Sequence, residues 1–325
     1  MRQQDFEQRH REAWQALHHL LDELERPRFR RRLSSSEQAR LPELYRDLCN
    51  HYALARSRRY SPALIAELHD LVTRSHRRFY QIHNNGNPWN LLHFFIADFP
   101  ATLRRHHGYF WLALALFLIP ALALGVLSYH NPEMIYSIME DGNVAEIEAM
   151  YNPQQRDDRS IHRGSESNFM MFGFYIKNNI SIGFRTFAGG ILLGLGTLFF
   201  LIYNGLVIGG VAGHLSQLGY HDTFWTFVAG HGSFELTAIV ICGAAGLLLG
   251  HAILAPGRYR RSEALKRRAR IALKLVIGAA ILLTIAAFIE AFWSSLQLPP
   301  TIKYSVAALL WITVIAHLTL GGRSR

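Results

Sequence analysis

Long runs of apolar residues dominate the chain after residue 108. Four of these runs have the roughly 17 to 25 residues that a helix needs to cross a bilayer. They lie at 109–129, 233–254, 271–293 and 304–320. A fifth run, 187–218, is too long for one simple span and too short for two ordinary ones, and its centre holds Asn204 and Gly205, a pair typical of a turn or a broken helix. We therefore expect an all-α, polytopic membrane protein with five to six membrane helices, in which the fifth run forms two spans or a re-entrant hairpin.

The first 87 residues show a different pattern, in which apolar residues recur every three or four positions. This spacing predicts three amphipathic helices over 3–25, 36–59 and 62–82, and their short connections favour a small antiparallel bundle. The following segment mixes Trp, Phe and Leu with arginines at its end, which is typical of a helix lying in the membrane interface. The predicted domains are a cytoplasmic three-helix bundle over 1–87, an interfacial amphipathic helix over 88–108 and a transmembrane domain over 109–325.

Charge predicts the orientation of these elements. Segment 257–270 carries seven Lys or Arg against one Glu, whereas segment 131–168 carries eight acidic residues against three Arg. Because Lys and Arg are enriched in cytoplasmic loops, we expect both termini in the cytoplasm and an acidic external segment over 130–168. The long polar N-terminal region predicts no cleavable signal peptide. The expected location is the bacterial cytoplasmic (inner) membrane, crossed several times.

The net charge of +10 fits the same topology. Arginine-rich cytoplasmic faces attract anionic lipid head groups, so the expected partners are the lipid bilayer and these head groups, with no nucleic acid. Cys49 and Cys242 fall in different parts of the chain, which excludes a disulfide framework and a cysteine-based zinc site. Ser216 and Ser233 have histidines nearby but no acidic third member, so we expect no enzyme.

Glycines recur four residues apart in the apolar runs. The pairs are Gly190 and Gly194, Gly205 and Gly209, Gly209 and Gly213, and Gly246 and Gly250. In lipid, close backbone contact between small residues supplies much of the association between helices. This pattern predicts tight, glycine-rich packing inside one chain or across a homodimer, and a homodimer is the preferred assembly.

Polar residues gather in one part of the membrane region. The candidate functional residues are Lys177, Asn178, Asn179, Arg185, Asn204, Gly205, His214, His231, Gly232 and Glu235. An ionised carboxylate inside a span costs about 2.5 to 3.5 kcal/mol, so Glu235 should be protonated or have a partner. The candidate partners are His231 on the same helix face, Lys177, Arg185 and His214.

Three interpretations of His231 and Glu235 are open. Their four-residue spacing lets both reach one metal ion, but two ligands do not make a site and the chain has no HExxH motif, so no metal or cofactor is expected. An ion or proton path would use Glu235 with its Asn and His neighbours. The favoured interpretation is a structural polar network that caps the start of the helix and joins it to the broken helix. Glu290, near the outer end of its span, is expected to reach water.

Two blocks of sequence together resemble the stage II sporulation protein M family of integral membrane proteins. They are FYIKNNISIGFRTFAGGILLGLGTLFFLIYNGLVIGGVAGHL and HGSFELTAIVICGAAGLLLG. The family motif falls on the Asn178-Asn179 pair, the Asn204-Gly205 step, and His231-Gly232 with Glu235, and the resemblance extends over about 90–320. The chain looks like members with an N-terminal cytoplasmic extension. It departs from the family in having Gly230 where Pro is usual, which predicts a looser entry into the helix.

The family takes its name from sporulation complexes that act with cell-wall-remodelling partners, and that name alone does not carry a sporulation role to this chain. The resemblance, together with two polar faces on a glycine-rich membrane core, implies a non-enzymatic membrane protein that assembles or anchors an envelope-associated complex. Its partner would be an unidentified membrane or cytoplasmic protein. The alternative is an ion- or proton-coupled transporter or channel that uses the polar residues around Glu235. Flux through reconstituted protein distinguishes the two.

Overall fold

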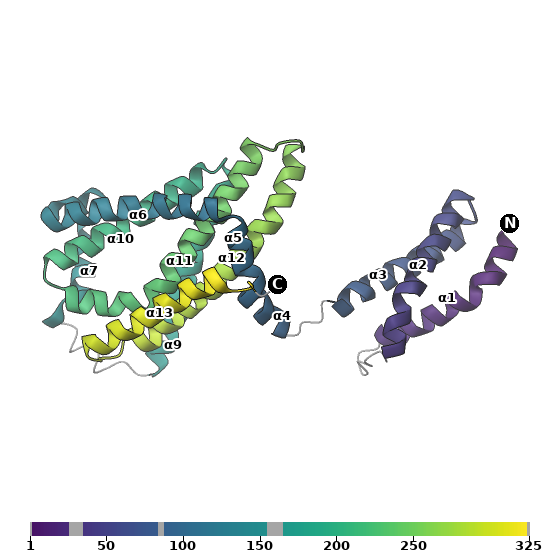
Figure 1. The fold of residues 1–325 in the computed structure, drawn as a ribbon, viewed down its shortest axis with the longest axis horizontal. Coiled ribbons are helices and arrows are strands. Elements are labelled where there is room, and N and C mark those ends of the chain that lie inside the picture. Colours follow the sequence, from purple (N-terminus) through teal and green to yellow (C-terminus); the bar gives the residue numbers. More distant parts are fainter. Residues whose placement is uncertain (1, 26–34, 84–87, 155–164, 324–325) are drawn as a thin grey trace. The chain divides into compact units, whose positions relative to one another are not determined.

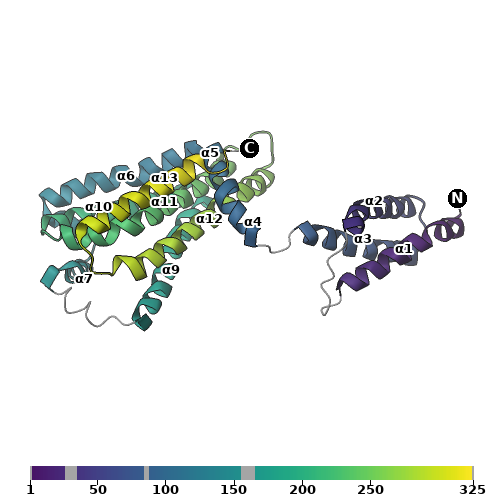
Figure 2. The same ribbon diagram turned by 60° about the horizontal axis from the view of Figure 1, so that its bottom comes forward.

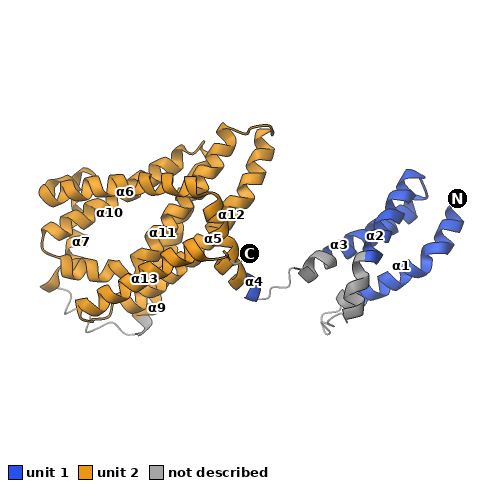
Figure 3. Cartoon of the chain, viewed as in Figure 1, with its two compact units in different colours: residues 1–90 blue, residues 91–325 orange. Residues whose placement is uncertain are grey.

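The computed structural model describes residues 2–25, 35–83, 88–154 and 165–323 (Figures 1 and 2). Every regular element in these ranges is a helix, so the predicted all-α class is confirmed. The chain divides into two compact units, residues 1–90 and residues 91–325, which are described separately below (Figure 3).

The first unit contains three long helices: α1 (Gln3–Glu25), α2 (Ser35–Ser57) and α3 (Pro62–His83). Their bounds lie within about two residues of the predicted ranges. The apolar positions that recur at helical spacing meet in one core, in which Phe6, Leu21 and Leu68 are fully buried. The amphipathic pattern of the sequence is thus the pattern of this core.

The second unit carries the membrane helices. Helix α4 (Pro88–His93) begins in the first unit and ends in the second. The further elements of the second unit are η1 (Phe94–Asp98), α5 (Phe99–Arg105), α6 (His107–His130), η2 (Pro132–Ser137), α7 (Asp141–Tyr151), α9 (Ser165–Ala188), η3 (Gly189–Ile191), α10 (Leu195–Gln217), α11 (His221–Leu254), α12 (Arg261–Ile289), η4 (Glu290–Ser294) and α13 (Pro300–Leu320). Among the described residues, five stretches are long and apolar enough to cross a membrane: α6, α10, α11, α12 with η4, and α13. The predicted polytopic membrane fold is therefore confirmed. Part of the predicted external segment 130–168 lies outside the described residues.

Helix α11 is the central helix of this unit. In its most apolar stretch 78 % of the residues are buried, against 22 % in α6 and 17 % in α13. It packs against α6, α9, α10, α12 and α13, and Figure 1 shows it with α6 and α10 on one side and α12 and α13 on the other. Polar side chains in the middle of α11, such as His231 and Ser233, are therefore enclosed by protein, whereas those at its two ends are exposed.

The predicted break at Asn204 and Gly205 is wrong. Helix α10 runs without interruption through both residues, and the chain turns earlier, between α9 and α10. At that turn Leu193 has a φ of 56° and Gly194 a φ of 86°, in the left-handed region that glycine tolerates best. The fifth apolar run thus supplies the turn and α10, and the other arm of the hairpin is the more polar helix α9.

Gly205 does not interrupt α10; its lack of a side chain lets α10 pack closely against α6. A methyl group at Gly205 would overlap the carbonyl oxygen of Phe117, and one at Gly209 would overlap that of Ala121. Gly213 meets Gly125 in the same way, so α6 and α10 run in parallel along their contact. These glycines contact a neighbouring helix of the same chain. A homodimer stays a prediction, and it would need a different surface.

Helix α11 begins at His221, twelve residues before the predicted start. The apolar window began at Ser233 because the preceding turns mix aromatic residues with Asp222 and His231. The helix continues through Gly230, where the absence of the usual proline predicted a looser entry. His231 and Glu235 consequently lie inside the helix, and the prediction that they cap its start is wrong.

The segment predicted to lie in the membrane interface forms α4, η1 and α5. Trp89 and Ile96 are exposed, but Phe99 is fully buried against Gly278 of α12. The Arg104 guanidinium donates hydrogen bonds to the carbonyl oxygens of Leu318 (2.8 Å) and Gly321 (2.5 Å) at the end of α13. These contacts attach α5 to the membrane helices and satisfy carbonyl groups that the helix end leaves open.

Candidate functional site

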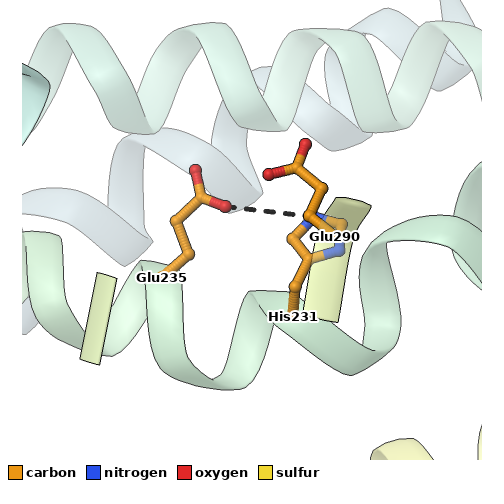
Figure 4. A group of neighbouring side chains, drawn as sticks. All are labelled: His231, Glu235 and Glu290. Carbon is orange, nitrogen blue, oxygen red and sulfur yellow. Dashed lines mark ion pairs between the residues drawn. The ribbon is translucent and has the colours of Figure 1, made fainter. Parts of the chain in front are cut away.

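Two carboxyl groups and one imidazole meet inside the membrane unit. His231 and Glu235 project from the same face of α11 toward Glu290 of η4 (Figure 4). Each offers one possible ligand atom, and the three atoms lie within 4.8 Å of one another. His231 Nε2 is 3.9 Å from Glu235 Oε2. We refer to His231, Glu235 and Glu290 as the carboxylate cluster.

The cluster is held on one side by a π-helical turn. Helix α12 widens into η4, which carries Glu290 and Ser294 four residues apart. The buried Ser294 hydroxyl lies 3.0 Å from His231 Nδ1, and its backbone carbonyl accepts a hydrogen bond of 2.8 Å from Lys303 Nζ of α13. Single π-helical turns inside helices occur frequently at functional sites, because the wider turn redirects side chains.

Helix α9 contributes a buried amide beside Glu290. The Asn179 side chain is only 2 % exposed, and its Oδ1 accepts a hydrogen bond of 3.1 Å from Asn178 Nδ2. Its Nδ2 adjoins the Glu290 carboxyl without reaching hydrogen-bond geometry and has no other partner. Glu290 Oε2 is also buried without a partner. Buried polar atoms are normally satisfied, so these two mark an incomplete arrangement.

The carboxylate cluster holds two acidic groups and one imidazole in an enclosed place. The exposed fraction is 6 % for the His231 side chain and 18 % for Glu235. Among the described residues, the only ion pair of Glu235 is the one with His231, and Glu290 has none; the buried Lys303 ammonium donates to the Ser294 carbonyl in the same turn as Glu290. Two carboxylates in such an enclosed place repel each other and lose their hydration, so the arrangement requires a proton or another cation.

The structure does not bring the other candidate residues into this site. Lys177, Asn178 and Arg185 have exposed side chains on α9, and no ion pair joins Lys177 or Arg185 to Glu235. Asn204 donates to the Phe200 carbonyl of its own helix (2.7 Å). Gly205 and Gly232 are buried in α10 and α11. Of the predicted set, only Asn179, His231 and Glu235 come together.

His214 belongs to a second site. Its Nε2 lies 2.7 Å from Glu148 Oε1, which joins the C-terminal part of α10 to α7. The side chains are 5 % and 35 % exposed, respectively. We refer to His214 and Glu148 as the outer pair, because the charge pattern of the sequence predicts that this end of α10 faces outside. His214 was a candidate partner for Glu235, and the structure pairs it with a different glutamate.

Sequence reasoning missed Glu290, Ser294 and Lys303 as parts of the site. Glu290 was expected to reach water, whereas its Oε2 is buried. One signal was present, because any carboxylate within an apolar run is a functional candidate by default. Ser294 and Lys303 carried no comparable signal, since only the packing of η4 and α13 against α11 brings them near His231.

Comparison with known proteins bears on the same region. Residues 113–295 match the family described as Stage II sporulation protein M, over more than half of the chain. The chain belongs to the stage II sporulation protein M family. Residues 4–81 match a second family, described as Domain of unknown function (DUF8413).

One similar protein comes from an archaeon. The chain is 31 % identical over 123 residues to the uncharacterized protein MJ0793 of Methanocaldococcus jannaschii, covering 37 % of this chain and 69 % of that protein. No solved structure matches the chain significantly. The stage II sporulation protein M region includes Asn179, the carboxylate cluster and Ser294, and it ends before α13 and Lys303.

Proposed function

We propose that this member of the stage II sporulation protein M family is a cation-coupled transporter or channel whose ion-binding group is the carboxylate cluster. One observation carries the proposal: Glu235, Glu290 and His231 meet within 4.8 Å inside the membrane unit, with no Lys or Arg ion-paired to either carboxyl among the described residues. Ionisable residues at such places typically mark ion pathways and proton relays.

A purely structural network accounts less well for these residues. Such a network stabilises a fold when every member has a hydrogen-bond partner, and a partly satisfied one costs more than an apolar core. Glu290 Oε2 and Asn179 Nδ2 have none. A bound cation would satisfy the carboxyl oxygens and remove their repulsion.

The position of the cluster suggests the side from which a cation enters. Helix α11 spans about 51 Å at 1.5 Å per residue, and His231 and Glu235 lie about 15 and 21 Å from its first residue. With both termini and the basic segment 257–270 in the cytoplasm of an inner-membrane protein, as charge predicts, this is the outer half of the helix. The cluster would then take up cations from outside.

Flux through the purified protein tests the proposal. Full-length protein in liposomes should conduct protons or metal cations above the level of empty liposomes, and E235Q and E290Q should each remove that flux. E146Q is the matched control, because Glu146 is an exposed glutamate on α7. Flux indistinguishable from empty liposomes for protons and a panel of mono- and divalent cations would refute the proposal.

A second candidate function is the assembly or anchoring of an envelope-associated complex. The observation that favours it is the separate compact unit of residues 1–90, which has a core of its own and a family match of its own. Such a unit suits recruitment of a cytoplasmic partner, whereas transport does not require it. Affinity purification of the full chain and of a chain lacking residues 1–87 should recover a specific partner only with the full chain. Equal recovery by both would exclude recruitment through this unit.

A further inference from the structure

We infer that the carboxylate cluster is a binding site for one divalent transition-metal cation of the zinc class, with His231, Glu235 and Glu290 as protein ligands. This inference rests on the proposed cation-coupled function, which it narrows to one class of cation. The sequence alone predicted no metal site, because His231 and Glu235 supply only two ligands. Glu290 is the third.

The three ligand atoms are close to a metal-binding arrangement. They lie within 4.8 Å of one another. Nitrogen and oxygen ligands lie about 2.0 to 2.2 Å from zinc, so neighbouring ligand atoms of a tetrahedral site are about 3.4 Å apart. The longest of these distances must therefore shorten by up to about 1.4 Å, a distance within the reach of rotation about the side-chain bonds of the two glutamates. Three protein ligands leave a fourth position open for water or for an exchanging ligand.

The His231 ring is already oriented for coordination. Its Nδ1 lies 3.0 Å from the Ser294 hydroxyl, while its Nε2 faces Glu235. With the proton on Nδ1 and donated to Ser294, Nε2 presents its lone pair to the cluster. Metal-binding histidines usually have their other ring nitrogen fixed by such a partner, which sets the tautomer and the ring orientation.

Asn179 provides an independent indication of a ligand. This amide is 98 % buried, its Nδ2 has no hydrogen-bond partner, and it adjoins the Glu290 carboxyl. If Glu290 turned its carboxylate toward a bound cation, Asn179 could donate to that carboxylate and hold it. The orphaned Asn179 amide and the orphaned Glu290 oxygen would then both be satisfied by the closure that a metal induces.

The ligand set selects the class of cation. One imidazole nitrogen and two carboxylates suit borderline ions such as Zn²⁺ or Fe²⁺, whereas Ca²⁺ and Mg²⁺ prefer an all-oxygen shell and Cu⁺ prefers sulfur. Charge favours a divalent ion, because two carboxylates and one M²⁺ with a neutral histidine sum to zero. A neutral site is the least costly one in an enclosed, low-dielectric place. Lys303 is directed to the Ser294 carbonyl and supports η4.

Zinc binding to the full-length protein in detergent tests the site. Metal-stripped protein is titrated with ZnCl₂ in a weakly chelating buffer, which removes zinc held loosely by the many surface histidines. We expect one tightly bound zinc per chain, a loss of affinity of about tenfold or more in E235Q, E290Q and H231Q, and a smaller loss in S294A. E146Q should bind as the wild type does. Unchanged affinity in both E235Q and E290Q would overturn the inference.

A measurement on the wild-type protein tests the site even if the variants do not fold. X-ray absorption of the zinc-loaded protein should show only nitrogen and oxygen neighbours at about 2.0 to 2.2 Å. A sulfur neighbour, or no zinc retained in the chelating buffer, overturns the site. Zinc bound without any ion flux supports the site and refutes the transport function, whereas proton flux without zinc binding supports transport and overturns the site.

Discussion

The membrane unit holds two histidine–glutamate sites that differ in how their charges are matched. In the outer pair, one glutamate meets one histidine at 2.7 Å and remains 35 % exposed. In the carboxylate cluster, one histidine serves two glutamates, and its distance to Glu235 is 3.9 Å. His214 Nδ1 also has no partner, but its site has no surplus carboxylate. The outer pair is thus matched one to one, whereas the cluster has a second carboxylate that needs a proton or another cation.

The two sites also differ in what they connect. The outer pair joins α10 to the short helix α7, and a second contact from Thr223 to the Tyr151 carbonyl (2.5 Å) holds the end of α7. The carboxylate cluster joins α11 to η4, with α9 and α13 close by. One-to-one pairing near the surface suits a tether, and surplus charge in the interior suits ligand binding.

The largest effect is expected from a substitution that disrupts the helix packing beside the outer pair and leaves the helices around the carboxylate cluster unchanged. A leucine at Gly213 would overlap the carbonyl of Gly125 and force α10 away from α6. Overpacking of this kind typically costs about 1 to 3 kcal/mol, and a backbone clash lies at or above the upper end. Thermal unfolding in detergent should show G213L strongly destabilised and the α10–α7 tether lost. Zinc binding should survive in the fraction that remains folded, because α9, α11 and η4 build that site.

G173L is the control for this substitution. Gly173 lies on α9, and nothing is within 4 Å of a methyl group placed there. G173L should therefore melt close to the wild type. If G213L abolished zinc binding in folded protein as well, the two sites would not be independent and the comparison would fail.

An intermediate effect of opposite sign is expected from neutralising one glutamate in each site. E148Q removes the hydrogen bond between the partly exposed Glu148 and the buried His214 and should cost about 1 kcal/mol. E235Q removes one of two mutually repelling carboxylates and should leave the metal-free protein equally stable or stabilise it by about 1 kcal/mol. Melting temperatures of the two metal-free variants measure the difference. A similar loss in both would mean that Glu235 is satisfied as well as Glu148.

Most of the fold could be predicted from the sequence, because membrane helices are set by apolar length alone. The windows at 109–129 and 304–320 match α6 and α13 to within four residues, and the window at 271–293 falls inside α12 with η4, which begins ten residues earlier at Arg261. The prediction of a break at Asn204 and Gly205 was wrong because of a tertiary contact. A glycine lowers local helix propensity, but here it allows α10 to approach α6, and that contact outweighs the local preference.

The candidate site could be predicted only in part. His231 and Glu235 are four residues apart on one helix, so their association follows from helical periodicity. Asn179 and Glu290 are far from them in sequence, and their approach depends on how α9 and α12 pack on α11. Lys177 and Arg185 were plausible partners by charge, but the side chains of both are exposed, whereas Asn179 is buried. Charge alone does not indicate which face of a helix turns inward.

The smallest effect concerns a histidine pair without any carboxylate between the rings, in the first unit. The ring centroids of His10 and His51 lie 3.9 Å apart, and His51 Nδ1 accepts a hydrogen bond of 3.3 Å from Trp14 Nε1. Burial lowers the pKa of both histidines below 6.5, with a further lowering from Arg9 for His10 and from His10 for His51. Asp47 acts in the opposite direction on both pKa values but does not outweigh these causes.

Protonation should therefore destabilise this unit. The unfolded chain binds more protons than the folded chain between pH 6.5 and the lowered folded-state pKa values, so stability falls as the pH drops through 6.5. Hydrogen exchange of α1 and α2 in the full-length protein, corrected for intrinsic rates, should show weaker protection at pH 5.5 than at pH 7.5. H51Q should reduce this dependence, whereas H69Q, which alters an exposed histidine on α3, should keep it. Equal protection at both pH values would mean that a histidine pair tolerates protonation without an acidic partner. An unpaired buried charge would then be weaker evidence for ion binding at the carboxylate cluster of the membrane unit as well.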